Sequence, residues 1–109
     1  MVDIETVRKL ALSFPETEEH DHWGRPSFRV KKKIFATLWP KEKRAVLKLS
    51  VSDQSLFSEY NAEVFYPIPN KWGKQGWTFV ELKKVRKDMF TDALNLAWRS
   101  VAPKGLLKE

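Results

Sequence analysis

The sequence predicts one α+β domain spanning residues 1–109, in which helices pack on an antiparallel sheet in the order α-β-β-β-α-β-β-α. Apolar residues near both ends recur every three or four positions, as on one face of a helix. Between residues 27 and 51, three short strand-like segments follow one another with short polar links. Short links favour an antiparallel meander, and a chain of 109 residues is the usual length of one domain.

The first helix is expected to begin after Asp3, whose carboxylate can cap it. Its apolar face contains Ile4, Val7, Leu10, Ala11 and Phe14. Pro15 disfavours helical backbone at the residue before it, so the helix should end near Ser13. Residues 16–22 are polar and acidic without a regular period, and we expect a loop there.

Strands are predicted over residues 27–30, 33–39 and 44–51. Lys31-Lys32 forms the first turn, but it lacks the Asn-Gly signature of a tight hairpin, so its length stays open. Residues 40–43 form the second turn. In the third strand, alternation predicts one face in the core and one mixed, cationic face. The core face contains Ala45, Leu47, Leu49 and Val51.

The second half of the chain should supply two helices and a strand pair. Ser52 can cap a short helix whose inward-facing residues are Leu56, Phe57 and Tyr60. Residues 77–82 form a strand, with residues 64–68 as its short partner. The last helix begins at Lys87 or Asp88 and stops before Pro103, and residues 105–109 form a flexible tail. Its apolar face contains Phe90, Ala93, Leu94, Ala97, Trp98 and Val101.

The net charge of +6 is distributed in blocks along the chain. Residues 25–50 hold 9 basic and 1 acidic side chains, whereas residues 1–24 hold 2 basic and 6 acidic ones. Such a block can produce a basic face that attracts a polyanion. The alternative is that lysines on strands keep the protein soluble and protect sheet edges.

Other features narrow the class of protein. With no Cys, disulfides, thiolate catalysis and cysteine zinc sites are excluded. No apolar run has the length of a membrane span, and the N-terminus lacks the regions of a signal peptide, so we expect no membrane association and a cytoplasmic location.

Five segments, taken in order, resemble the MmcQ/YjbR family of small bacterial proteins over essentially the whole chain. They are His22-Trp23-Gly24-Arg25-Pro26-Ser27-Phe28, Ile34-Phe35-Ala36, Val46-Leu47-Lys48-Leu49, Trp72-Gly73-Lys74-Gln75-Gly76-Trp77 and Ala97-Trp98-Arg99-Ser100-Val101-Ala102-Pro103-Lys104. The resemblance implies the element order given above. It also implies DNA binding, because the family's fold is similar to a "double wing" DNA-binding domain of a phage transcription activator, although a fold does not determine a function.

DNA binding requires several cations on one face, where they neutralise phosphates. The candidate nucleic-acid-binding residues are Arg25, Arg29, Lys31, Lys32, Lys33, Lys48, Lys71 and Lys74. The alternative for these residues is a solvated sheet face.

The five tryptophans divide into two groups. Trp77 and Trp98 occupy periodic positions and are predicted to lie in the core. Trp23 and Trp72 adjoin glycines in predicted loops, and with His22 and Arg25 they could line a small cleft. Such a cleft could hold a small anionic ligand on Arg25, or it could dock an acidic or apolar protein partner. Exposed tryptophans could also stack on bases.

We expect neither catalysis nor a cofactor. No serine lies in a nucleophile-elbow motif, and the glycines of residues 72–76 do not match a phosphate-binding loop. His20 and His22 form a His-x-His pattern, but the chain has no other histidine, so a third metal ligand would have to be a carboxylate. We therefore assign no catalytic and no metal-binding residues.

Overall fold

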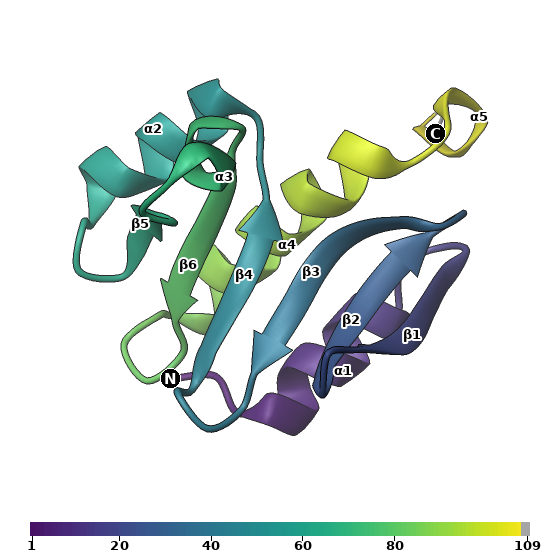
Figure 1. Ribbon diagram of the computed structural model, residues 1–109, viewed down its shortest axis with the longest axis horizontal. Helices are drawn as coiled ribbons and strands as arrows, with labels where there is room; N and C mark the ends of the chain where they lie inside the picture. The colour runs from purple at the N-terminus through teal and green to yellow at the C-terminus, as the bar shows by residue number, and fades with distance from the viewer. Residues whose placement is uncertain (108–109) are drawn as a thin grey trace.

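A six-stranded antiparallel sheet organises the computed structural model, which describes residues 1–107. Its strand order is β1-β2-β3-β4-β6-β5 (Figure 1). The strands are β1 (Thr17–His22), β2 (Arg25–Val30), β3 (Lys33–Trp39), β4 (Arg44–Lys48), β5 (Phe65–Pro67) and β6 (Trp77–Glu81). β4 pairs directly with β6, and β5, which precedes β6 in the chain, lies beyond it at the edge of the sheet. The expected α+β order is confirmed, with β1 and two short helices in addition.

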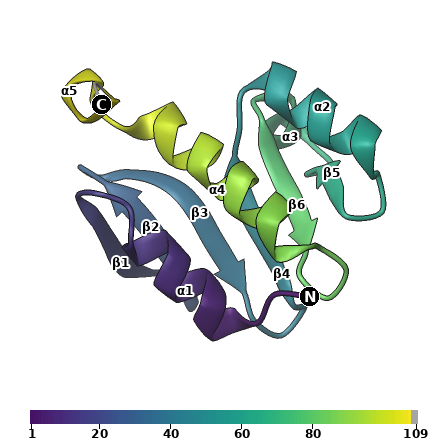
Figure 2. The ribbon, with the colours of Figure 1, turned by 180° about the vertical axis from the view of Figure 1, so that it is seen from behind.

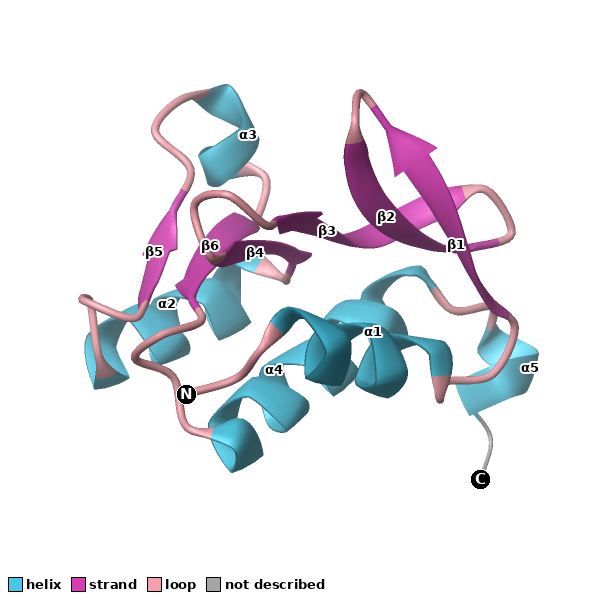
Figure 3. Ribbon diagram, turned by 90° about the horizontal axis from the view of Figure 1, so that it is seen from below, coloured by secondary structure: helices cyan, strands magenta, loops and turns pink. Residues whose placement is uncertain are grey.

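The helices divide between the two faces of the sheet. Three of them, α1 (Ile4–Leu12), α2 (Val51–Tyr60) and α4 (Lys87–Val101), lie on one face (Figures 2 and 3). On the other face, the β1–β2 hairpin rises at one side and the short helix α3 (Lys71–Lys74) at the other (Figure 3). Within residues 1–107, no helix covers this second face between the hairpin and α3, and we call it the open face.

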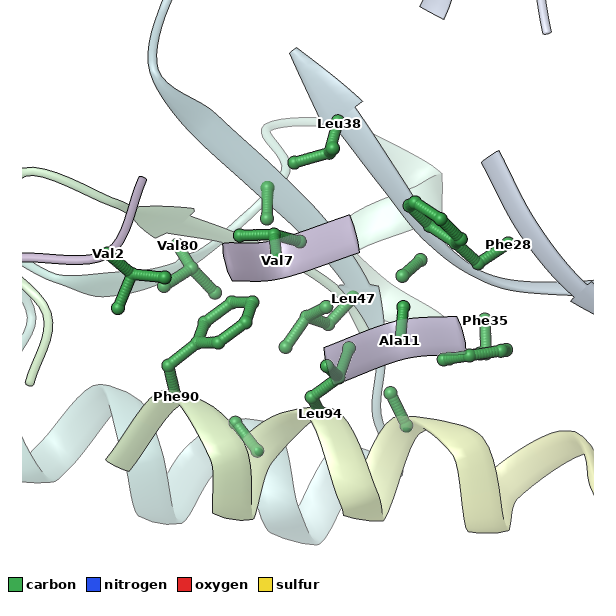
Figure 4. Close-up of a cluster of buried hydrophobic side chains, with 14 of the residues drawn as sticks. Val2, Val7, Ala11, Phe28, Phe35, Leu38, Leu47, Val80, Phe90 and Leu94 are labelled. Carbon is green, nitrogen blue, oxygen red and sulfur yellow. The ribbon is translucent and has the colours of Figure 1, made fainter. Parts of the chain in front are cut away.

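The core lies between the sheet and helices α1 and α4. Val7 of α1 and Phe90 of α4 meet Leu47 and Val80 from the central strands, and all four are fully buried (Figure 4). Trp98 is also in the core, as predicted: it is 5% exposed, stacks on Phe14 and donates from Nε1 to the Pro15 carbonyl at 3.1 Å. The periodicity of the last helix is thus explained by packing.

The first helix forms as expected. The Asp3 carboxylate accepts from the Thr6 backbone N–H at 2.8 Å, and the helix ends at Ser13. For the second helix, the predicted boundary is wrong. Ser50, not Ser52, is the N-cap, because β4 ends at Lys48 and the chain turns directly into α2.

Two of the three residues predicted to face inward from α2 are exposed. Leu56 and Tyr60 point to solvent, and only Phe57 packs on the core, against Phe65. Val51, which was predicted to lie on the core face of a strand, is also exposed. It is the first residue of the helix, so strand alternation does not apply to it.

The loop predicted over residues 16–22 is wrong, because Thr17 to His22 form β1. This strand is at the edge of the sheet and is held by its backbone pairing with β2. The Arg8 guanidinium also ties it to α1 through Glu19 at 3.1 Å. A polar edge strand has no apolar alternation to read in the sequence.

The C-terminal region contains one further helix. Residues 105–107, where we expected the flexible tail to begin, lie in α5 (Lys104–Leu107), and residues 108 and 109 lie outside the described part of the chain. No helix within residues 1–107 combines the length and apolar character needed to cross a membrane.

Candidate functional site

The open face of the sheet carries an aromatic layer. Thr37, Val46, Phe79 and Tyr66 lie opposite one another on β3, β4, β6 and β5, so their side chains share this face. Trp39 packs edge-on against Phe79, with ring centroids 5.0 Å apart. Aromatic side chains thus bury this face where no helix covers it.

A cleft of about 560 Å³ is hollowed into this face. We call it the tryptophan cleft, because four of the five tryptophans line it. Trp39 and Trp77 project from the strands, Trp23 from the β1–β2 turn, and Trp72 from α3. The full lining comprises His22, Trp23, Arg25, Lys32, Ile34, Thr37, Trp39, Val46, Ile68, Trp72 and Trp77.

Two tight hairpin turns, one at each end of β2, each contribute a residue to the cleft lining. The β1–β2 turn consists of Trp23 and Gly24, with φ of 56° and 81°, and the β2–β3 turn consists of Lys31 and Lys32, with φ of 48° and 75°. Positive φ at both central residues is what a type I′ turn requires, and Asn-Gly is its usual sequence. The open length of the Lys31-Lys32 turn is therefore settled at two residues.

Helix α3 also contributes a residue to the cleft lining, and close backbone packing holds it in place. A side chain on Gly73 would overlap the carbonyl oxygen of Ile68, and one on Gly76 would overlap that of Leu49. Only glycine permits both approaches, and Gly76 also has φ of 105°. The Asn70 side chain accepts from the Trp72 N–H at 2.8 Å and starts the helix. These contacts fix the base of Trp72.

Gln54 ties α3 to α2 through the sheet. Its side-chain amide lies 2.9 Å from the Gly73 carbonyl, 3.2 Å from that of Trp77 and 3.1 Å from the Thr78 hydroxyl. The side chain is 6% exposed, so these contacts are made away from water. A buried polar group of this kind is costly unless it is satisfied, and here it specifies where α3 sits.

The predicted cations fall into two groups. Lys31, Lys32 and Lys33 at the hairpin turn, and Lys71 and Lys74 on α3, are exposed. We call these five the rim lysines, because they lie at the β2–β3 turn and on α3, two elements that each contribute a residue to the cleft lining. Two of the other three candidates make contacts within the protein, and the third is partly buried. Arg25 lies over the Trp39 ring at 3.9 Å with Glu42 4.0 Å away, Lys48 donates to the Gln75 carbonyl at 3.0 Å, and Arg29 has its Nε buried without a partner in the described residues.

A neutralised cluster lies beside the cleft on the same face. The Glu81 carboxylate accepts from Arg44 Nε at 3.0 Å and from the Tyr66 hydroxyl. Burial, and then the hydrogen bond and charge of Glu81, raise the pKa of Tyr66 above its usual value near 10. Arg44 is therefore paired within the protein and adds little attraction for an anion.

The two histidines do not form part of a metal-binding cluster within the described residues. His20 Nε2 lies 2.9 Å from the Glu18 carboxylate, whereas His22 lines the cleft. Within the described residues, no group of three or more His, Cys, Asp or Glu side chains is arranged to hold a metal ion.

The structure places His22, Trp23, Arg25 and Trp72, the four predicted cleft residues, around one cavity. Sequence reasoning missed the floor of that cavity. Trp77 was predicted to lie in the core, but it is half-buried and lines the cleft. Strand alternation could have shown this. Thr78 and Val80 of β6 face the core, so Trp77 must point to the opposite face of the sheet.

Comparisons with known proteins agree with this fold. A family model described as YjbR matches residues 12–100. The crystal structure of Deinococcus radiodurans protein DR2400, described with the domain DUF419, superposes with a TM-score of 0.83 at 18% identity. The match covers 96% of this chain and 82% of that one, and at this identity it shows the fold alone. No curated protein matches the chain. Because the family model spans most of its length, the chain belongs to the YjbR family.

Proposed function

We propose that this protein binds nucleic acid through the tryptophan cleft and the rim lysines. The observation that carries the proposal is a cleft lined by four indoles together with Arg25 and Lys32, with the exposed Lys71 and Lys74 on the neighbouring helix α3. Protein grooves that bind nucleic acid combine basic side chains that follow the phosphate backbone with aromatic rings that stack on bases. The proposal involves binding only, with no catalytic step and no cofactor.

The rim lysines supply the attraction for phosphates. If all five contact phosphates, affinity should fall roughly 100- to 500-fold between 50 and 200 mM salt, since each contact releases counterions. Arg25 would contribute less, because its guanidinium already contacts Trp39 and lies near Glu42. A steep salt dependence is thus the signature of this interface.

Fluorescence anisotropy with labelled 20-nucleotide DNA, single-stranded and duplex, tests the proposal at 50 and 200 mM salt. The variant Lys32→Gln/Lys71→Gln removes one rim lysine from the β2–β3 turn and one from α3. It should weaken binding and reduce the salt slope by about two.

The matched control is Lys9→Gln/Lys87→Gln, which removes the same charge from α1 and α4 on the helix-covered face. If both double variants weaken binding equally, the overall positive charge explains the binding, and the proposed interface is wrong. If the folded protein binds neither DNA at 50 mM salt, the proposal fails.

A second candidate is a small anionic molecule with a planar ring. The volume of about 560 Å³ lies in the range typical of ligand pockets, and the lining includes the exposed Lys32 and the partly engaged Arg25 as cationic groups. A mononucleotide probe separates the candidates. Saturable binding with a shallow salt dependence, together with no binding of either DNA, would favour the small ligand.

A further inference from the structure

Trp23 occupies an unusual position at the tip of the β1–β2 hairpin. Its side chain is 87% exposed, and its backbone has φ of 56°. Left-handed backbone disfavours residues with a Cβ, and a bulky aromatic residue there is a rare exception. Packing does not explain this choice, because the side chain is almost fully exposed. Turn geometry does not explain it either, since Asn before Gly24 would suit the turn better.

The same kind of backbone occurs again at the edge of the cleft. Lys32, in the next turn, has φ of 75° and also lines the cleft. The two turns therefore present one indole and one ammonium group to the same cavity.

Helix α3 presents a second exposed indole. Trp72 is 50% exposed, on a helix held by Gln54 and the close packing of Gly73. Trp23 in the β1–β2 turn and Trp72 in α3 thus both line the cleft. The hairpin and α3 rise on opposite sides of the open face (Figure 3). The floor between them includes Trp39 and Trp77.

We infer that the cleft takes the unpaired bases of a single-stranded nucleic acid, with Trp23 stacking on a base. The inference rests on the proposed function and specifies its ligand. In a duplex, the faces of the bases are hidden within the stack, and only phosphates and base edges are accessible. An indole cannot stack on either of these. A single strand offers both π-faces and phosphates, and so matches a cavity lined with indoles and flanked by lysines.

The test compares three labelled probes, each 20 nucleotides long: a single strand, a duplex and a single strand of abasic sites. The abasic strand retains the phosphates and lacks the bases. Stacking on an aromatic residue corresponds to roughly a 5- to 150-fold change in Kd per base. We expect the single strand to bind more tightly than the abasic strand by at least the lower figure.

The variant Trp23→Asn separates stacking from folding. It gives the turn its preferred Asn-Gly pair, so the unfolding temperature should stay the same or rise. Binding of the single strand should weaken about 5-fold or more, whereas binding of the abasic strand should not change. Trp23→Phe, which retains an aromatic ring, should restore part of the lost affinity.

The outcomes distinguish this inference from the proposed function. If the duplex and abasic strand bind as tightly as the single strand, or if Trp23→Asn leaves single-strand binding unchanged, stacking in the cleft is refuted while nucleic-acid binding stands. If no probe binds to the folded protein, the proposed function itself fails.

Discussion

Gln54 connects the stability of the fold to the geometry of the cleft, although it lies on α2 and does not line the cavity. Replacing Gln54 with Leu keeps a similar volume and removes the amide. The three contacts to Gly73, Trp77 and Thr78 are then lost together. We expect α3 to be held less firmly and Trp72 to be less well positioned.

The cost follows from counting donors and acceptors. The amide has two N–H groups for three acceptors, so it makes at most two strong hydrogen bonds at once. The carbonyls of Gly73 and Trp77 each keep another partner, from the backbone N–H of Gly76 and Ile68 respectively. No carbonyl is orphaned, so the loss is about 0.5–1.5 kcal/mol per hydrogen bond, or about 1–3 kcal/mol in total.

Urea unfolding followed by circular dichroism measures this loss, and the Kd for labelled single-stranded DNA measures the effect on the cleft. Ser55→Ala, an exposed change on the same helix, is the control and should leave both quantities nearly unchanged. A loss below about 0.5 kcal/mol for Gln54→Leu would refute the reasoning that buried amide bonds hold α3.

Three further predictions concern other parts of the fold. Trp98→Ala should lower the free energy of unfolding by about 3–5 kcal/mol, and a loss below about 1 kcal/mol in urea would show that its indole is not core. The pKa of Tyr66 is raised in the folded protein, so above pH 10 the folded protein keeps a proton that the unfolded chain loses, and the free energy of unfolding should fall as pH rises. In urea unfolding at several pH values, Tyr66→Phe should flatten this decline. An identical decline in the variant would contradict the assignment. Gly76→Ala should destabilise more than Gly24→Ala by thermal unfolding, because both have positive φ but only at Gly76 does the new Cβ overlap backbone. Equal losses would mean that φ alone matters.

The elements that bury apolar side chains could be predicted from sequence. The last helix shows a strong 3.6-residue period because one face packs on the sheet, and β4 shows alternation for the same reason. The edge strand β1 could not be predicted, since its polar side chains carry no burial pattern and backbone pairing with β2 creates it. The cap of α2 was misplaced by two residues, because two serines near the turn are chemically equivalent.

The candidate site was only partly visible in the sequence. Trp23 and Trp72 could be selected because they adjoin glycines outside periodic segments, whereas Trp77 looked like core because it lies in a strand. Which face of a strand is covered depends on where helices pack. The sequence of β6 alone cannot show that its Trp77 side faces an open cleft.

By itself, the sequence determined the blocks of charge, the family resemblance and the order of the main elements, because local spacing and charge are properties of neighbouring residues. The tertiary structure decided which residues meet. Strand pairing brings Trp23, 49 residues before Trp72 in the chain, to the same cavity, and it brings Lys32 of the β2–β3 turn there as well. Contacts between residues so distant in sequence depend on the register of the whole sheet, and that register is a property of the folded chain.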